Sequence, residues 1–139
     1  MTSRTLAVIS AGLSKPSSTR MLADRLADAT ARRLEETGDD VRVEVVELRD
    51  LAHDITNNLL TGFPGAALAD AIDTVTGADG LLAVTPIFSS SYSGLFKSFF
   101  DVLEPGAIAD QPVLIGATGG SSRHSLALDY AIRPLFAYL

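Results

Sequence analysis

Residues 6–20 read Leu-Ala-Val-Ile-Ser-Ala-Gly-Leu-Ser-Lys-Pro-Ser-Ser-Thr-Arg, and this stretch sets the fold class. Its first residues are apolar without alternation, which is typical of a strand whose sheet is covered on both faces. A loop rich in hydroxyl groups follows, and apolar residues at helical spacing begin after Ser17. A buried strand, a short loop and an amphipathic helix form the repeating unit of an α/β domain.

The same unit recurs along the chain. Residues 41–47 alternate between apolar and polar, as expected of an edge strand, whereas the other apolar runs are continuous. We expect strands at 5–10, 41–47, 80–85 and 112–117, helices at 17–37, 65–76, 94–103 and 122–139, and one long irregular connection at 48–64. This order predicts an α/β fold with a doubly wound parallel sheet and right-handed crossovers.

The chain is long enough for one domain, which spans residues 1–139. In a sheet of four strands, the run at 112–117 would form a hydrophobic edge, which is prone to aggregation. Residues 136–139 are apolar and lie inside a helical pattern without a capping signal. We therefore expect a fifth strand and a last helix to follow, so that the domain is C-terminally truncated here.

The composition argues against several classes of function. The chain has no cysteine and two histidines, so neither a disulfide framework nor a metal site is expected. The net charge of −6 argues against nucleic-acid and anionic-membrane partners. The apolar run at 6–10 is too short for a signal peptide or a membrane span, so we expect a cytoplasmic protein.

The loop after the first predicted strand has features of an anion-binding site. Ser17, Ser18 and Thr19 stand where hydroxyls could donate to a phosphate, beside the N–H groups of a helix start. Ligands of open α/β sheets bind at this end of the strands. A serine before a helix also serves simply as an N-cap. Neither a P-loop nor a G-x-G-x-x-G turn is present, so a single phosphate is expected.

Two further loops follow the predicted strands at 80–85 and 112–117. Residues 86–88, Pro-Ile-Phe, are apolar, and they pack under their own loop or offer a wall to a flat ligand. Residues 118–121, Thr-Gly-Gly-Ser, end the other strand, and glycines let a ring approach the main chain. A phosphate loop, an apolar wall and a glycine platform at one edge match flavin mononucleotide, FMN.

Three stretches carry a resemblance to the flavodoxin-like, NAD(P)H-dependent FMN reductases, and this resemblance covers essentially the whole chain. Residues 10–20 resemble the family's serine-rich phosphate loop. Residues 85–101, Thr-Pro-Ile-Phe-Ser-Ser-Ser-Tyr-Ser-Gly-Leu-Phe-Lys-Ser-Phe-Phe-Asp, resemble its P-x-Y-x-x-S-x-x-G-x-L-K-x-x-x-D segment. Residues 117–134 are similar to the A-T-G-G…H-x-L-A-x-D-Y-A-x-x-P segment of reductases that supply two-component, alkanesulfonate-type monooxygenases.

This resemblance implies a fold, an activity and a set of binding residues. The fold would be a parallel sheet of order 2-1-3-4-5, and the activity hydride transfer from NADPH or NADH to FMN. Reduced flavin would pass to a partner monooxygenase, and the protein would be a homodimer or homotetramer. The cofactor-binding residues, carried over by position, are Ser10, Leu13, Ser17, Ser18, Thr19, Thr85, Pro86, Ile87, Phe88, Ser91, Thr118, Gly119, Gly120 and Ser121.

Other residues of these motifs have two interpretations. The cofactors carry the chemistry themselves, so no catalytic residue is predicted. Tyr130 matches a family tyrosine on a π-bulge beside the flavin at a subunit interface, or it is an ordinary packed residue. His124 and Arg123 are candidates for contact with the nicotinamide or a phosphate of NADPH, although an exposed helix residue is favoured for His124. Lys97 and Asp101 match the motif and are expected to be structural.

Two other functions on this fold stay open. A quinone or azo-dye reductase with bound FMN would differ mainly in its acceptor. A flavodoxin-type electron carrier usually has a T-x-T-G-x-T loop, which is absent. A phospho-receiver domain would need acids where Ser10 and Thr85 stand, so it is discarded. Relatives often have arginine at Ser14, asparagine at Thr19 and tyrosine at Phe88, and these departures suit a reductase that releases FMN.

Overall fold

The structure is a computed structural model and describes residues 2–124 and 126–139. Its strands are β1 (Ser3–Ser10), β2 (Asp40–Glu47), β3 (Gly80–Phe88), β4 (Ser91–Tyr92) and β5 (Val113–Thr118). Its α-helices are α1 (Ser18–Glu36), α2 (Ala52–Thr61), α3 (Ala66–Thr76), α4 (Gly94–Asp101) and α5 (Arg133–Tyr138). Shorter turns are the 3₁₀ helices η1 (Leu48–Leu51) and η2 (Ser122–His124) and the π-helical turn η3 (Leu128–Ile132).

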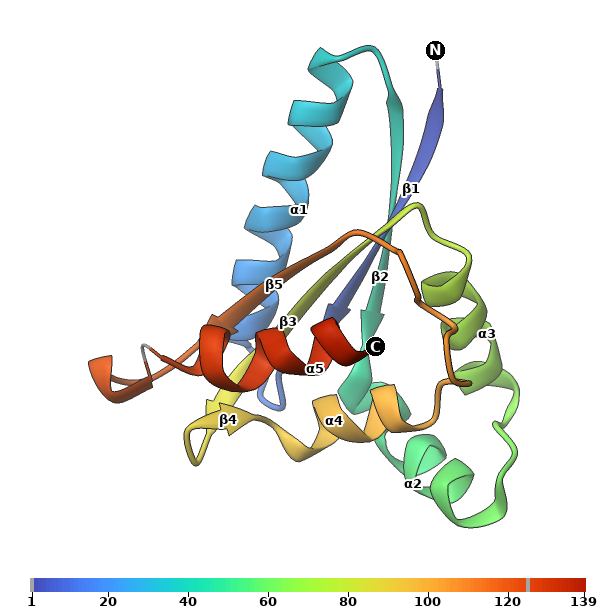
Figure 1. Cartoon of the computed structure of the whole chain (residues 1–139), viewed down its shortest axis with the longest axis vertical. Helices are drawn as coiled ribbons and strands as arrows, with labels where there is room; N and C mark the ends of the chain where they lie inside the picture. Colours follow the sequence, from blue (N-terminus) through green and yellow to red (C-terminus); the bar gives the residue numbers. More distant parts are fainter. Residues whose placement is uncertain (1, 125) are drawn as a thin grey trace.

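The long strands form a parallel sheet in the order β2-β1-β3-β5 (Figure 1). Ser10 lies beside Glu47 of β2 and beside Val84 of β3, so these strands end at a common edge. The short strand β4 turns back antiparallel on the end of β3. The α/β class, the order of the parallel strands and the edge position of β2 are confirmed, with β5 in the place predicted for the fourth parallel strand.

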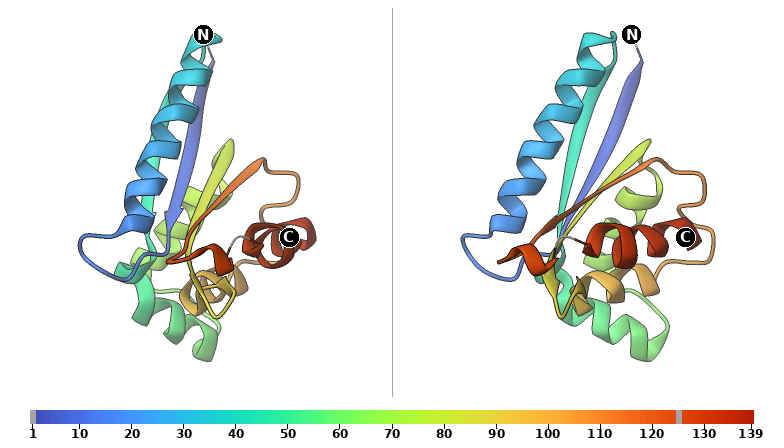
Figure 2. Two further views of the ribbon diagram at one scale, coloured as in Figure 1. Left: turned by 90° about the vertical axis from the view of Figure 1, so that its left-hand side faces the viewer. Right: turned by 60° about the vertical axis from the view of Figure 1, so that its left-hand side comes forward.

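Alternate side chains of the central strands pack on opposite faces of the sheet. Leu6 and Val8 of β1 pack against α1, where Ala23 is fully buried. Ile9 belongs to the larger core on the other face, together with the fully buried Phe96 of α4. Figure 2 shows α1 on one side of the sheet and α3, α4 and α5 on the other. Cover on both faces is the physical reason for the continuous apolar runs of β1 and β3.

The connection at 48–64 is not irregular, so that prediction was wrong. The turn η1 leads into α2, and both Leu48 and Ile55 are fully buried in the core. Gly62 has a φ of 85° and ends α2 in the left-handed conformation. The spacing of Leu48, Leu51 and Ile55 is the helical signal that the sequence analysis missed.

Two other elements differ from their predicted form. Strand β3 continues beyond residue 85 to Phe88, because β4 pairs with this extension. The helix predicted at 122–139 is divided into η2, η3 and α5. Pro134 stands in the first turn of α5, where a missing N–H group is tolerated.

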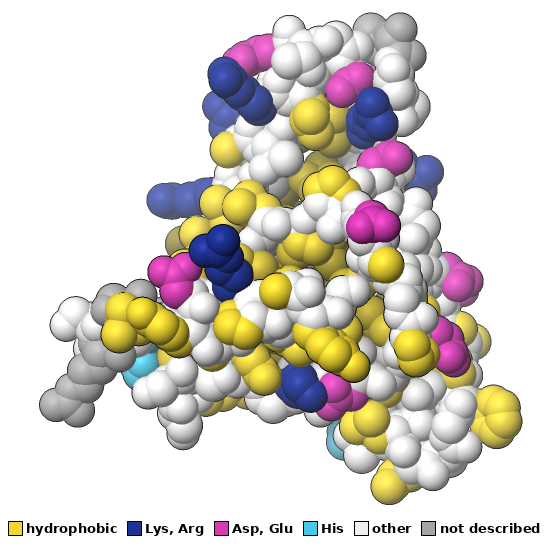
Figure 3. Space-filling model, viewed as in Figure 1, with side chains coloured by type: hydrophobic (Ala, Val, Ile, Leu, Met, Phe, Trp, Pro, Cys, Tyr) yellow, Lys and Arg dark blue, Asp and Glu magenta, His cyan; other side chains and the backbone are white. Residues whose placement is uncertain are grey.

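The far side of β5 carries apolar side chains at the surface. Leu114 is 48% exposed, and a groove of about 420 Å³ runs between β5 and α5. Figure 3 shows hydrophobic side chains in the middle of this face. A further strand beside β5 stays a prediction.

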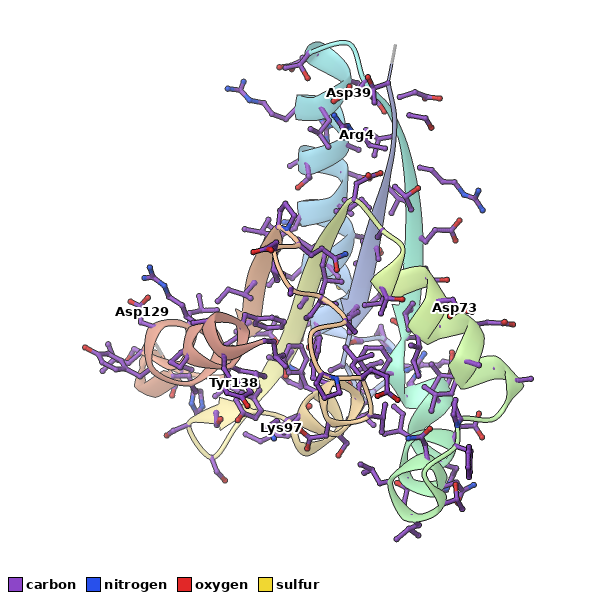
Figure 4. All side chains as sticks on the ribbon, turned by 45° about the vertical axis from the view of Figure 1, so that its right-hand side comes forward. Arg4, Asp39, Asp73, Lys97, Asp129 and Tyr138 are labelled. Atoms are coloured by element: carbon purple, nitrogen blue, oxygen red, sulfur yellow. The ribbon has the colours of Figure 1, made fainter. Side chains whose placement is uncertain are left out.

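At the amino edge of the sheet, Arg4 Nε lies 3.8 Å from Asp39 Oδ2, well away from Lys97 (Figure 4).

Candidate functional site

Three loops leave the carboxyl edge of the sheet at adjacent strands. Residues 11–17 follow β1, residues 89–90 follow β3 and residues 119–121 follow β5 (Figure 1). The parallel register places Pro86 of β3 beside Thr118 of β5. The structure therefore brings the three predicted loops together at the edge where open α/β sheets bind ligands.

Ser17 is the N-cap of α1. Its Oγ accepts a hydrogen bond from the N–H of Arg20 at 3.1 Å. Gly12 lies against this hydroxyl, since a Cβ at position 12 would come within 2.0 Å of Ser17 Oγ. Ser18 and Leu13 are exposed at the surface. Gly12 is thus a residue of the loop that the sequence analysis missed, and its signal was a glycine between a strand and a helix.

The hydroxyls of Ser10 and Thr19 are both buried, but their partners differ. Thr19 Oγ1 lies 2.8 Å from Thr118 Oγ1, and this hydrogen bond joins the first loop to the end of β5. Thr19 is 2% exposed, so its hydroxyl faces Thr118 and not solvent. Ser10 is fully buried, and among the described residues its Oγ has no hydrogen-bond partner. A ligand atom would satisfy that hydroxyl.

The hairpin after β3 places an aromatic ring at the surface. Ser89 and Ser90 form its tip with φ values of 50° and 66°, which few residues with a side chain adopt. Phe88 is 47% exposed, whereas Ile87 is 8% exposed and packs with Ile132. Ile87 therefore packs under its own loop, whereas the role of Phe88 as a wall for a flat ligand stays a prediction.

The hydroxyl of Thr85 supports the same hairpin. Its Oγ1 accepts from the N–H of Ser93 at 3.1 Å and donates to the carbonyl of Pro86 at 2.9 Å. Ser93 in turn caps α4 by accepting from the N–H of Phe96 at 3.2 Å. Ser91 lies in β4 and is partly exposed. Thr85 thus contacts its own loop, and Ser91 is the more accessible hydroxyl.

The two glycines of the third loop leave room for different things. A Cβ on Gly119 would lie 2.9 Å from the Cβ of His124, so glycine at 119 lets His124 fold back on the loop. A Cβ on Gly120 would meet nothing within 4 Å. Gly120 therefore has the open backbone that a ring would need. The neighbouring Gly119 lines a hollow of about 220 Å³, together with Ile87, Ala117, Ser121, Ser122, His124 and Leu128.

His124 is partly buried in η2, so its interpretation as an exposed helix residue is wrong. Its Nδ1 is buried and has no hydrogen-bond partner among the residues described. The His124 side chain also lines the hollow, together with Gly119 and Ser121. The side chain of Arg123 lies outside the described part of the chain.

Charged side chains gather on the outer side of the first loop, and the sequence analysis did not single them out. Arg49 Nη1 donates to the carbonyl of Ser14 at 2.8 Å. The carboxylate of Glu47 lies between Arg49 Nη2, at 3.4 Å, and Arg20 Nη1, at 3.3 Å. The hydrogen bond that Arg20 Nε donates to Asp24 raises the pKa of Arg20 above its ordinary value. Arg49 lies outside the motifs, so no local pattern identified it.

Tyr130 lies in a π-helical turn, as the resemblance implied. The N–H of Arg133 bonds to the carbonyl of Leu128, which is the π-helical spacing. Tyr130 is 76% exposed, so it is not an ordinary packed tyrosine.

On the surface of α4, Lys97 Nζ lies 2.7 Å from Asp101 Oδ1, and this hydrogen bond raises the pKa of Lys97. That pair fits the structural role expected of it.

The residues present at this edge fit FMN. The start of α1, Ser18 and the unpartnered hydroxyl of Ser10 offer donors to a phosphate. Phe88 and the open backbone at Gly120 suit a flat ring. Across residues 2–124 and 126–139, no group of His, Asp and Glu side chains could hold a metal ion. Fold and site together define a flavodoxin-like, mononucleotide-binding domain.

The chain belongs to the NADPH-dependent FMN reductase family, whose model matches residues 4–139. The FMN reductase (NADPH) of Pseudomonas aeruginosa is 36% identical over 132 residues, which cover 94% of this chain and 67% of that protein. The NADH-dependent FMN reductase SfnE of Pseudomonas putida is 35% identical, with 94% and 68% of the two chains covered. The chain thus spans about two thirds of the length of these relatives.

Solved structures show the same likeness. An oxidoreductase from Corynebacterium diphtheriae is 45% identical, with a TM-score of 0.96 over 99% of this chain and 76% of the other. The apo form of the NADH:FMN oxidoreductase EmoB is 37% identical, with a TM-score of 0.79 over 95% of this chain and 67% of the other. These matches confirm the fold class and the family that the three sequence stretches indicated.

Proposed function

We propose that this protein is an NAD(P)H-dependent FMN reductase, which transfers a hydride from reduced nicotinamide to FMN. One observation carries the proposal: the hydrogen bond between Thr19 and Thr118 holds the anion-binding loop beside the open backbone at Gly120. A phosphate on the first loop and an isoalloxazine on the third would then belong to one FMN molecule. The family match over residues 4–139 supports the same activity.

In this reaction, the part of the chain's own residues is to bind FMN and orient its ring. FMN, when bound, supplies the ring that accepts the hydride from C4 of the nicotinamide, and water supplies the remaining proton. The first N–H groups of α1 and the hydroxyls of Ser10 and Ser18 would donate to the phosphate. Phe88 would offer an aromatic face to the ring, and the backbone at Gly120 would let the ring approach. No side chain is required to act as an acid or a base.

We further propose that a second subunit completes the site in a homodimer or homotetramer. The hollow of about 220 Å³ is smaller than the roughly 300–1,000 Å³ of complete small-molecule sites. Leu128 lines this hollow and is 37% exposed. Leu126 and Tyr130, two residues away on either side in the chain, are 64% and 76% exposed and offer further apolar contact. The resemblance to sulfonate-type reductases favours a partner monooxygenase that receives the reduced flavin.

The proposed reaction also favours a place in the cell. Its hydride donor, reduced nicotinamide nucleotide, is regenerated in the cytoplasm, and we propose that the protein works there. Among the described helices, none is both long enough and apolar enough to cross a membrane.

The assay is oxidation of NADPH and of NADH, followed by near-ultraviolet absorbance, with and without added FMN. Both coenzymes are used, because one relative is named for NADPH and another for NADH. We expect oxidation that depends on added FMN and saturates with it. Turnover that ignores added FMN and requires a quinone would contradict the proposal and support a quinone reductase with bound flavin.

A further inference from the structure

Arg49 holds the first loop, residues 11–17, from the side that faces away from the third loop, residues 119–121. It stands in η1, just after β2, and its Nη1 donates to the carbonyl of Ser14 at 2.8 Å. We propose that Arg49 is a positioning residue for the phosphate of FMN. It holds residues 11–17 in the conformation that presents the start of α1 to an anion. This inference rests on the proposed function.

The anchored carbonyl lies in the middle of the loop. At one end, the N–H of Ala11 bonds to the carbonyl of Val84 at 3.0 Å. At the other end, Ser17 caps α1. Ser14 lies between these two points, and its own hydroxyl donates to the carbonyl of Pro16 at 3.1 Å. Arg49 therefore ties the exposed middle of the loop to the end of the sheet.

Glu47 fixes the position of Arg49. One carboxylate oxygen lies 3.4 Å from Arg49 Nη2, and the other lies 3.3 Å from Arg20 Nη1. The side chains of Glu47 and Arg49 are 16% and 19% exposed, so this ion pair is less screened than a surface pair. A guanidinium is needed here because its two terminal nitrogens point in fixed directions, one to the loop and one to Glu47.

A positioning role can be separated from simple attraction between charges. If Arg49 acted only as a nearby positive charge, Glu47 would oppose phosphate binding, and Glu47→Gln would strengthen it. If Glu47 instead holds Arg49 on Ser14, the same change releases the loop. The loop then spends less time in the binding conformation, and the apparent affinity falls. The two explanations therefore predict opposite signs for Glu47→Gln.

The experiment compares FMN with riboflavin, which lacks the phosphate. Dissociation constants for both flavins would be measured by quenching of flavin fluorescence, together with thermal unfolding of the flavin-free protein. We expect Arg49→Met to weaken FMN binding by roughly tenfold or more, since a charge-assisted hydrogen bond is lost. Riboflavin binding should change by no more than about twofold, because the loop only contacts the phosphate. Arg42→Met, on the exposed part of β2 where Arg42 pairs with Glu44, is the matched control and should change neither.

Glu47→Gln keeps the shape of the side chain. It therefore tests the same proposal if the Arg49→Met variant does not fold. We expect it to weaken FMN binding selectively. Equal weakening of both flavins, or stronger FMN binding by Glu47→Gln, would overturn the proposal. A wild-type protein that does not distinguish FMN from riboflavin would overturn it as well. In that case FMN-dependent oxidation of NADPH or NADH would still leave the proposed function standing.

Discussion

Thr19 Oγ1 and Thr118 Oγ1 lie 2.8 Å apart, although the two residues are 99 positions apart in the chain. The bond joins the first turn of α1 to the end of β5. Both residues stand in motifs that predicted contact with a ligand, yet in the structure each hydroxyl has the other as its partner. Under the proposed function, the spacing that this bond sets between the first and third loops decides whether one FMN can reach both.

The two halves of this pair should respond unequally to loss of a hydroxyl. Thr118→Val leaves the hydroxyl of Thr19, which is 2% exposed, without a partner, and should lower the free energy of unfolding by about 2 kcal/mol. Thr19→Val leaves the hydroxyl of Thr118, which is partly exposed and open to water, and should cost about 1 kcal/mol. Urea unfolding of the flavin-free protein measures both values.

The double variant is the control for this pair. With both hydroxyls replaced by methyl groups, no polar atom is left unpaired, so the cost should be close to that of Thr19→Val alone. Costs that simply add would mean that the two hydroxyls do not depend on each other. The hydrogen bond would then have no part in stabilising the two loops.

The glycines at 119 and 120 should separate packing from flavin contact. Gly119→Ala puts a Cβ within 2.9 Å of the Cβ of His124, so it should lower both the melting temperature of the flavin-free protein and the affinity for FMN. Gly120→Ala meets nothing within 4 Å, so it should leave the melting temperature unchanged. It should still weaken FMN binding about tenfold if the ring lies on this backbone.

Calorimetry and fluorescence titration on the same two variants give both numbers. A Gly120→Ala variant that binds FMN like the wild type would remove the third loop from the ring site. A Gly119→Ala variant with an unchanged melting temperature would mean that His124 moves away at no cost.

The sequence predicted the parallel sheet well, because continuous apolar runs and glycine-rich strand ends are local signals. It predicted α2 poorly, since the helical spacing of Leu48, Leu51 and Ile55 lies among polar residues. Contacts between distant parts of the chain could not be predicted from the sequence. Neither the pairing of Thr19 with Thr118 nor the bond from Arg49 to the Ser14 carbonyl leaves a trace in any local pattern.

A side chain at position 12 should lower the stability of the protein unless the hydroxyl of Ser17 is removed as well. Gly12→Ala would place a Cβ within 2.0 Å of Ser17 Oγ and expel the N-cap, at a cost of about 1 kcal/mol in unfolding free energy. FMN binding should weaken as well, because the cap sets the start of α1. Gly94→Ala at the start of α4, where a Cβ meets nothing within 4 Å, is the matched control.

Ser17→Ala should make the Gly12 change nearly silent. Without Oγ, the new Cβ lies 3.1 Å from the Cβ of residue 17 and 3.2 Å from the Cβ of Thr19, and a small shift of the loop relieves both contacts. The double variant Gly12→Ala/Ser17→Ala should therefore be about as stable as Ser17→Ala alone. If the double variant instead loses as much free energy of unfolding as the two single variants together, then glycine at position 12 does not serve to make room for the hydroxyl of Ser17.

Phe88 offers the sharpest test of the apolar wall, because the chain contains a matched phenylalanine. Phe88 is 47% exposed at the end of β3, and Phe63 is 79% exposed between α2 and α3. Phe88→Ala should leave the melting temperature of the flavin-free protein within a few degrees of the wild type, since little buried area is lost. It should weaken FMN and riboflavin binding alike, by about fivefold, because the contact is with the ring and not with the phosphate. Phe63→Ala should change neither stability nor flavin binding. Loss of FMN affinity with riboflavin affinity retained would place Phe88 near the phosphate and move the ring away from the hairpin.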